Sequence, residues 1–302
     1  MKMDFETFKA MTLDALQAHY GKDAVEISFQ EVLKNNDTKH TGVLIRLADG
    51  NKKAAPLLYI DQDYQNLCDD TISFDEYIDR LIETRKADNI SYWDLDLTLV
   101  EDWEKAKVHV YPVLISAERN NHTVENLVSK DYLDMRIIYI LRNVIDNGDN
   151  SSIRITKDMF ERYGITMDVL HKQAMDNLRT DRYGFFRLED LLFCLGGYPD
   201  PVQSIGEEGS ELYCLTNNRK VYGAAGLLDI EMIGRAANGR NLYILPSSIH
   251  ELLFLLDDGA RNTAELNAMI REINQSTVLP DEVLSDHAYY YCAADREIRI
   301  AA

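Results

Sequence analysis

The sequence is poor in cysteine, proline and tryptophan, and these shortages exclude several classes of protein. Its 302 residues include four cysteines, six prolines and two tryptophans. The cysteines are scattered without a C-x-x-C pair, so they match neither a zinc site nor a disulfide framework. No apolar run approaches the ~20 residues that a transmembrane helix requires. We therefore expect a globular cytoplasmic protein without a metal or a cofactor.

Basic residues are also few. There are 32 lysines and arginines against 51 aspartates and glutamates, which gives a formal net charge of -19. Such a field repels phosphate backbones and anionic lipids, and nucleic-acid binding normally requires a basic patch. The basic residues form only short pairs such as Lys52-Lys53. The composition thus predicts neither nucleic acid nor a membrane surface as a partner.

The first part of the chain has the pattern of a helix followed by a meander. Residues 4–20 predict an amphipathic helix that carries acidic residues, in place of the apolar segment of a signal peptide. Alternating apolar residues at 25–29, 43–47 and 57–60 predict three short strands. Ser73 and Glu76 form an S-x-x-E capping box at the start of a further helix. We assign residues 1–115 to a first lobe.

The densest apolar material lies at residues 211–256, in a second lobe of residues 116–302. The order here is strand, turn, a helix over 224–236 that ends at Asn238-Gly239, and a strand that begins at Leu242. The run at 252–256 fits a helix or a strand, because periodicity does not separate the two for a short apolar run. Ser248 and Glu251 form another capping box, which favours the helix.

Elsewhere in the second lobe, Pro112 within the apolar run 108–115 indicates an edge strand or a bend. Thr156 and Thr166 have the positions of helix N-caps. Residues 287–300 predict a terminal hairpin, in which Tyr289-Tyr290-Tyr291 exposes at least one ring. The sequence as a whole predicts an α+β fold, with mainly antiparallel sheets and helices packed on their faces.

Five segments carry a resemblance to a known family. They are YLDMRIIYIL, ITMDVLHKQAMDNL, LYCLTNNRKVYGAAGLLD, LYILPSSIHELLFL and LSDHAYYY, in this order. In them the chain resembles family 5688 of the domains of unknown function, a group of gut Firmicutes and clostridial proteins, over close to its full length. The resemblance implies a bacterial, cytoplasmic protein. It implies no catalytic residues, because the family has no established activity.

A polar cluster between two apolar stretches supplies the first catalytic candidates. Ser247 or Ser248 is a candidate nucleophile with His250 as its base. Triad members normally come from separate elements, however, and the G-x-S-x-G elbow is absent. Asp286 and His287 are candidates to join His250 as metal ligands or as an acid–base pair. A structural histidine bonded to backbone is the alternative, since no H-E-x-x-H spacing occurs.

Small residues at 223–226 supply candidates for ligand binding. Gly223 and Gly226 flank two alanines at the start of the predicted helix, where backbone N–H groups favour anions, and Asn217 lies in the turn before them. The Lys-Ser/Thr of a P-loop is missing. Close packing of the helix against a strand is the alternative interpretation.

These observations favour a non-enzymatic module that binds a protein or a small ligand through the second lobe, with its oligomeric state left open. The alternative is a hydrolase, metal-dependent or of the Ser/His type, centred on His250 with Asp286 and His287.

Overall fold

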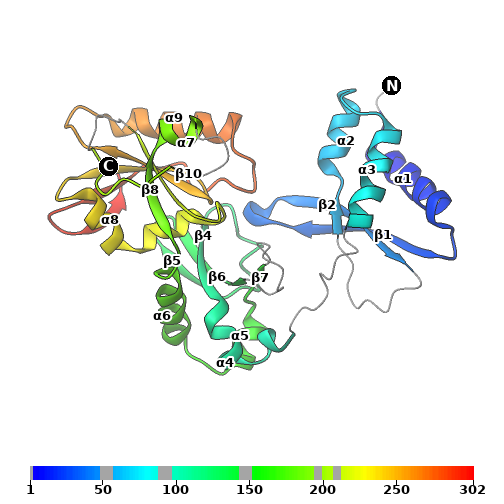
Figure 1. Cartoon of the computed structure of the whole chain (residues 1–302), viewed down its shortest axis with the longest axis horizontal. Coiled ribbons are helices and arrows are strands. Elements are labelled where there is room, and N and C mark those ends of the chain that lie inside the picture. Colours follow the sequence, from blue (N-terminus) through cyan, green and yellow to red (C-terminus); the bar gives the residue numbers. More distant parts are fainter. Residues whose placement is uncertain (1–2, 48–56, 88–96, 143–151, 194–198, 207–211) are drawn as a thin grey trace. The chain divides into compact units, whose positions relative to one another are not determined.

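The structure is a computed structural model that describes residues 3–47, 57–87, 97–142, 152–193, 199–206 and 212–302 (Figure 1). Helices accompany three sheets whose paired strands are antiparallel, which confirms the α+β class. The described residues form two compact units. Unit 1 comprises those in 3–34 and 38–87, and unit 2 comprises 35–37 and those from 97 to 302.

Unit 1 confirms the predicted helix and meander. Its elements are α1 (Phe5–Tyr20), β1 (Val25–Leu33), β2 (Lys39–Leu47), β3 (Leu57–Tyr59), α2 (Asp61–Cys68) and α3 (Phe74–Ala87). The strands form one antiparallel sheet in the order β1-β2-β3. The predicted capping box is present, because the Ser73 amide donates to Glu76 Oε2 at 2.8 Å and the Glu76 amide donates to Ser73 Oγ at 3.2 Å.

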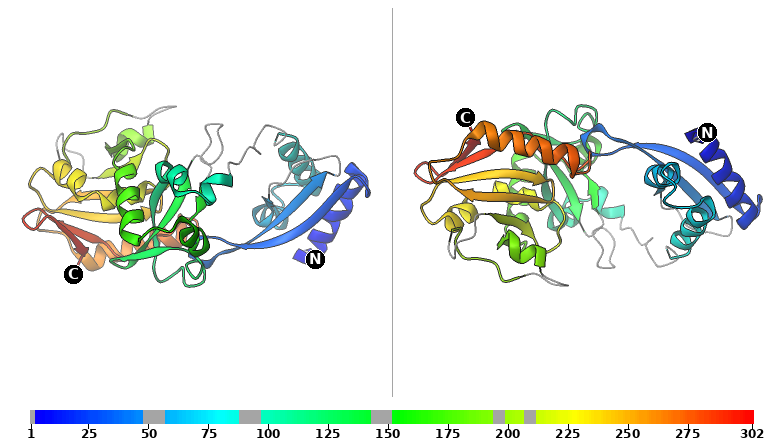
Figure 2. Two further views of the ribbon diagram at one scale, coloured as in Figure 1. Left: turned by 90° about the horizontal axis from the view of Figure 1, so that it is seen from below. Right: turned by 90° about the horizontal axis from the view of Figure 1, so that it is seen from above.

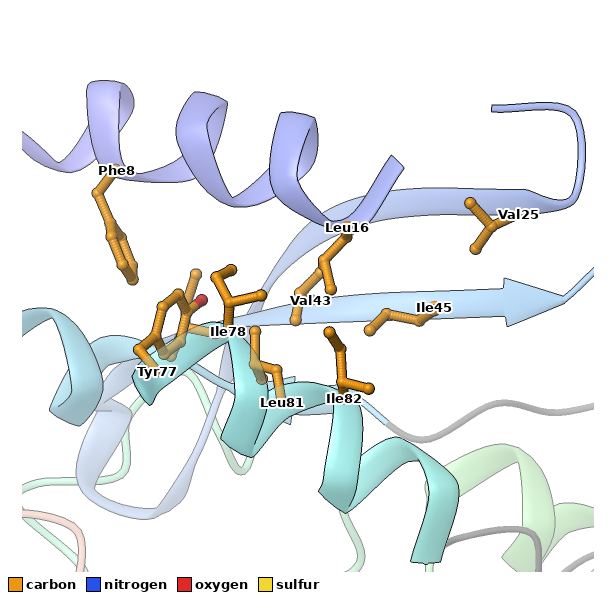
Figure 3. Close-up of a cluster of buried hydrophobic side chains, with 10 residues drawn as sticks. Phe8, Leu16, Val25, Val43, Ile45, Tyr77, Ile78, Leu81 and Ile82 are labelled. Atoms are coloured by element: carbon orange, nitrogen blue, oxygen red, sulfur yellow. The ribbon is translucent and has the colours of Figure 1, made fainter. Parts of the chain in front are cut away.

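A hydrophobic core holds the helices of unit 1 against its sheet. Figure 3 shows side chains of α1 and α3 directed towards those of β1 and β2. The buried members of the cluster are Phe8, Leu16, Val25, Val43, Ile45, Ile60, Tyr77, Ile78, Leu81 and Ile82. Burying each of the larger side chains contributes about 1.5–3 kcal/mol to folding.

Unit 2 contains a four-stranded sheet in which β6 (Met135–Arg142) pairs with β4 (Val110–Ser116), β5 (Ser129–Tyr132) and β7 (Ser152–Arg154). Among the described strands β4 pairs only with β6, so Pro112 lies on an edge as predicted. The helical segments beside this sheet are η2 (Leu97–Val100), α4 (Trp103–Ala106), η3 (Lys107–His109), α5 (Lys157–Tyr163) and α6 (Met167–Leu178). Thr156 and Thr166 cap α5 and α6, as predicted.

The second sheet of unit 2 has six antiparallel strands in the order β13-β12-β10-β11-β9-β8. They are β8 (Tyr183–Arg187), β9 (Tyr213–Asn217), β10 (Leu242–Ser248), β11 (Glu251–Leu256), β12 (Tyr289–Cys292) and β13 (Glu297–Ile300). The last two confirm the terminal hairpin. Figure 2 shows α9 (Thr263–Ser276) lying along one face of this sheet. Leu266 and Ile270 of α9 pack there against Leu245 and Leu255.

Further helical segments complete unit 2: η1 (Asn35–Asp37), α7 (Leu188–Phe193), η4 (Gly223–Leu228) and α8 (Ile230–Ala237). The single helix predicted over 224–236 is therefore wrong, because Asp229 separates η4 from α8 and caps the latter through the Met232 amide at 3.2 Å. Residues 35–37 are grouped with unit 2, where the Asn36 amide donates to Asn120 Oδ1 at 2.7 Å.

The helix favoured from Ser248 onwards is also wrong. Residues 242–256 form a hairpin of β10 and β11, with a register irregularity between Pro246 and Ser248. Leu253 and Leu255 face α9, whereas Leu252 and Phe254, which point to the opposite face, are fully buried. Both faces of β11 are thus covered by apolar side chains, which explains a continuous apolar run in a strand.

The boundary between residues 115 and 116 stays a prediction. In the structure, the described residues 97–115 are grouped with unit 2, and residues 88–96 lie outside the described part of the chain.

Candidate functional site

His250 lies in the turn between β10 and β11, and both of its ring nitrogens have partners. The Tyr222 amide donates to Nδ1 at 3.1 Å, and Nε2 lies 3.3 Å from Glu282 Oε1. The ring stacks on that of Tyr222, with centroids 5.8 Å apart. A backbone amide only donates, so Nδ1 accepts and Nε2 carries the proton that faces Glu282. His250 therefore has no free lone pair for a base while these contacts hold.

The two candidate serines stabilise the same hairpin. Ser247 Oγ donates to Glu251 Oε1 at 3.0 Å, and Ser248 Oγ accepts from the His250 amide at 3.0 Å. Neither hydroxyl has an imidazole partner among the described hydrogen bonds. The structure places Ser247 and Ser248 at the end of β10 and His250 in the turn that follows, without a nucleophile–base contact.

The candidate ligand-binding residues are buried and bonded within unit 2. Asn217 Oδ1 accepts from the Arg219 amide at 3.1 Å, and its Nδ2 donates to the Val221 carbonyl at 2.9 Å. A Cβ on Gly223 would lie 2.3 Å from the His250 carbonyl oxygen, and one on Gly226 would lie 2.8 Å from the Tyr183 ring. Close packing therefore accounts for both glycines.

His287 has a partner that the sequence did not indicate, Asp134 in the turn between β5 and β6. Asp134 Oδ2 accepts from His287 Nδ1 at 3.0 Å and from Ser285 Oγ at 2.7 Å. Its Oδ1 accepts from the Tyr289 hydroxyl at 2.7 Å, and burial raises the pKa of that tyrosine. An ionised carboxylate only accepts, so Nδ1 of His287 donates and the lone pair is on Nε2. The His287 side chain is 46% exposed.

Asp286, the neighbour of His287, connects two segments through hydrogen bonds. Its Oδ2 accepts from the Arg119 guanidinium at 2.7 Å and its Oδ1 from Asn274 Nδ2 of α9 at 2.8 Å. Burial alone would raise the pKa of Asp286, but the hydrogen bonds from Asn274 and Arg119 lower it below its ordinary value. Both oxygens of Asp286 thus have partners other than His250.

His250, Asp286 and His287 were predicted to act together, but each is bonded to partners of its own. The described residues show no contact between His250 and either of the other two. Within the described ranges, no three His, Cys, Asp or Glu residues gather in a group that could hold a metal ion.

A cavity of about 180 Å³ lies in unit 2, on the side of the six-stranded sheet that α9 covers. It is lined by Tyr243, Asp257, Thr263, Tyr290, Arg299, Ala301 and Ala302. The Tyr290 hydroxyl donates to Asp257 Oδ2 at 2.6 Å, and this hydrogen bond raises the pKa of Tyr290 to about 12. The ring of Tyr243 meets that of Tyr290 edge-on at 5.2 Å, and the Arg299 guanidinium lies 5.4 Å from the Tyr290 ring centre.

The pairing of three strands brings the aromatic and basic side chains of this cavity together. Tyr243 of β10 pairs with Tyr290 of β12, which pairs in turn with Arg299 of β13. Tyr290 is thus the half-buried ring of its triplet, whereas Tyr289 and Tyr291 are buried. The alternation indicated such a ring, but nothing in the sequence connected it with Asp257 or Arg299.

Fold and site together define an α+β protein with a small polar and aromatic cavity on its larger sheet. Residues 5–293 match the model of a family described as "Family of unknown function (DUF5688)", and the chain belongs to this family. Comparison with curated proteins and with solved structures finds no match. No helix in the described part of the chain is long and apolar enough to cross a bilayer.

Proposed function

We propose that this protein is a binding module that takes a small molecule with a carboxylate and a flat apolar body. The observation that carries the proposal is the cavity beside Tyr243 and Tyr290, which combines aromatic walls with a charged side chain at its edge. Concave, partly apolar sites with a few convergent polar groups are the usual form of small-molecule sites.

The apolar part of the ligand is selected by the two tyrosines. Their edge-to-face arrangement presents ring surface to the cavity, and flat groups gain dispersion and quadrupole contacts on such surfaces. The cavity volume of about 180 Å³ is smaller than that of sites for drug-sized ligands. Those sites have volumes of roughly 300–1,000 Å³. The ligand is therefore the size of a small metabolite.

The anionic part is selected by Arg299. Both oxygens of Asp257 already accept hydrogen bonds, from the Tyr290 hydroxyl and from the Gly259 amide at 2.9 Å. Within the described residues, the Arg299 side chain has no hydrogen bond or ion pair, and its guanidinium lies over the Tyr290 ring. The guanidinium is thus available to a ligand, and its fork of donors matches a carboxylate.

The test uses benzoate as the probe, with affinity measured by calorimetry and the site by NMR shifts of the tyrosine rings. We expect Arg299→Gln to weaken benzoate binding ~10-fold or more, because a hydrogen-bonded charge contributes about 1.5–3 kcal/mol. Arg299 is exposed, so the variant should keep its fold.

The matched control is Arg296→Gln, which removes the same charge from the same hairpin. Arg296 is bonded to Glu231 at 2.7 Å and does not line the cavity. It should leave benzoate affinity unchanged apart from weak long-range screening. Equal weakening by both variants, or shifts confined to residues outside the cavity, would rule the proposal out.

The proposed setting is the cytoplasm of a bacterium. Cys68, Cys214 and Cys292 are free thiols, which suits a reducing compartment. A gut Firmicutes source rests on the sequence resemblance alone. No response to benzoate in the parent protein would contradict the small-molecule proposal.

A further inference from the structure

We propose that His287 is a nucleophilic centre oriented by Asp134, and that it accepts acyl groups from small activated esters. The site is separate from the cavity of Tyr243 and Tyr290, and the proposal does not depend on ligand binding there. Asp134 is its positioning residue, since it acts through the imidazole.

The first observation is the tautomer. His287 donates from Nδ1 to Asp134, which leaves the lone pair on Nε2, and nearly half of the side chain is exposed. His250 has the opposite arrangement, with Nδ1 occupied by an amide donor and Nε2 facing Glu282. A carboxylate on one imidazole nitrogen fixes the tautomer and the orientation of the ring. The arrangement of His287 therefore suits a nucleophile, whereas that of His250 does not.

The second observation is the fixed position of the carboxylate. The Asp134 side chain is 25% exposed and also accepts from Ser285 and Tyr289. His122 also lies near a carboxylate, with Nδ1 3.2 Å from Glu125, but these side chains are 74% and 66% exposed. Solvent-exposed pairs of this kind contribute little, because water competes for both partners. His122 is therefore a natural internal reference.

The third observation is that the backbone around His287 is held on both sides. The Ser285 hydroxyl accepts from the His287 amide at 3.0 Å. On the preceding residue, Asp286 is bonded to both Arg119 and Asn274. A ring held in this way loses little freedom when it reacts, which is the general advantage of a pre-organised group.

The chemistry is acyl transfer to Nε2. The Nε2 lone pair attacks the ester carbonyl carbon, and the carbon–oxygen bond breaks with its electron pair leaving on the phenolate or alkoxide. The acyl-imidazolium carries its charge next to the Asp134 carboxylate. Water then adds to the acyl carbon, and the carbon–nitrogen bond breaks with its electron pair returning to Nε2, which restores the neutral imidazole. The carboxylic acid leaves, and the remaining proton from the water passes to the released phenolate or alkoxide.

The test follows the release of p-nitrophenolate from p-nitrophenyl acetate by the full chain, from mildly acidic to neutral pH. We expect His287→Gln to remove most of the protein-dependent rate. His122→Gln and His19→Gln should retain it, the latter because the His19 ring meets that of Tyr20 and has no carboxylate partner among the described residues. Mass spectrometry of peptides should find the acetyl group on His287 before any other histidine.

The role of Asp134 is tested by Asp134→Asn, which keeps the shape of the side chain and removes its charge. We expect the His287-dependent rate to fall ~10-fold or more, in the range typical of partners that orient a functional imidazole. The pH dependence of that rate should also change, which a purely structural role would not produce. If this variant does not fold, the His287→Gln result and the site of acetylation decide the matter. A full rate in His287→Gln, or acetylation of His122 as fast as of His287, overturns the proposal.

Discussion

At the scale of single residues, a buried ion pair joins Arg142 of β6 to Asp181. The two side chains are 5% and 10% exposed, and the Arg142 guanidinium also lies 4.1 Å from the ring centre of Tyr111. Asp181→Asn would leave a buried charge without its partner, which typically costs about 3–5 kcal/mol. We expect urea unfolding to show a loss of this order.

The matched control for that substitution is Asp176→Asn. Asp176 pairs with Lys172 and Arg179 on the surface, where all three side chains are at least 44% exposed. Exposed pairs contribute about 0–1 kcal/mol, so this variant should unfold at nearly the parent urea concentration. Similar losses in the two variants would show that the Arg142–Asp181 pair is not effectively buried in solution.

The roles of individual side chains in the candidate site were the hardest feature to predict from the sequence. Ser247, Ser248 and His250 have the residue types of a hydrolase, but their partners determine their roles. The donor to His250 is 28 positions away along the chain, and the acceptor of His287 is 153 positions away. Spacing along the chain therefore did not reveal that His287 donates from Nδ1 and that His250 does not.

At the scale of elements, Asp286 connects α9 with the segment that follows β4. The pKa of Asp286 is lowered in the folded protein, despite its burial, by Asn274 and Arg119. The Asp286 carboxyl therefore binds a proton more readily in the unfolded chain than in the folded protein. At pH values above the ordinary aspartate pKa, the ionised carboxylate stabilises the fold. This stabilisation is lost as the pH falls through the folded pKa, within about pH 5 to 1.

We accordingly expect the free energy of unfolding of the parent protein to fall more steeply with acid than that of Asp286→Asn. The measurement is urea unfolding at several pH values from neutral to about pH 2.5, which extends from above the ordinary aspartate pKa to below it. The asparagine keeps an oxygen for Asn274 or Arg119 but cannot titrate. Parallel pH profiles for the two proteins would mean that Asp286 gains no stabilisation from these partners.

Elements with a strong local signal were predicted well, and those defined by their neighbours were not. The capping box of α3, the N-caps of α5 and α6 and the meander of unit 1 depend on residues a few positions apart. Ser248 and Glu251 have the same spacing as Ser73 and Glu76, yet they lie in a hairpin. Pairing of β11 with β9 and β10 and coverage of both its faces outweighed the local helix signal.

At the scale of the whole molecule, each unit has its own hydrophobic core. The core of unit 1 gathers around Phe8, whose ring lies 5.0 Å from Tyr77 and 5.3 Å from Tyr64. In unit 2, Phe254 is buried to the same extent and meets Phe185. Separate cores of this kind are the physical basis of independent folding.

This organisation gives a reciprocal prediction. Phe8→Ala should remove about 3–5 kcal/mol from unit 1, enough to unfold it, because the cavity left in a packed core is not refilled. Hydrogen exchange followed by mass spectrometry should then accelerate in α1, β1, β2 and α3 and remain slow in β9 to β12. Phe254→Ala should give the reverse pattern. If either substitution accelerates exchange equally in both units, they unfold as one cooperative body and the two cores stabilise each other.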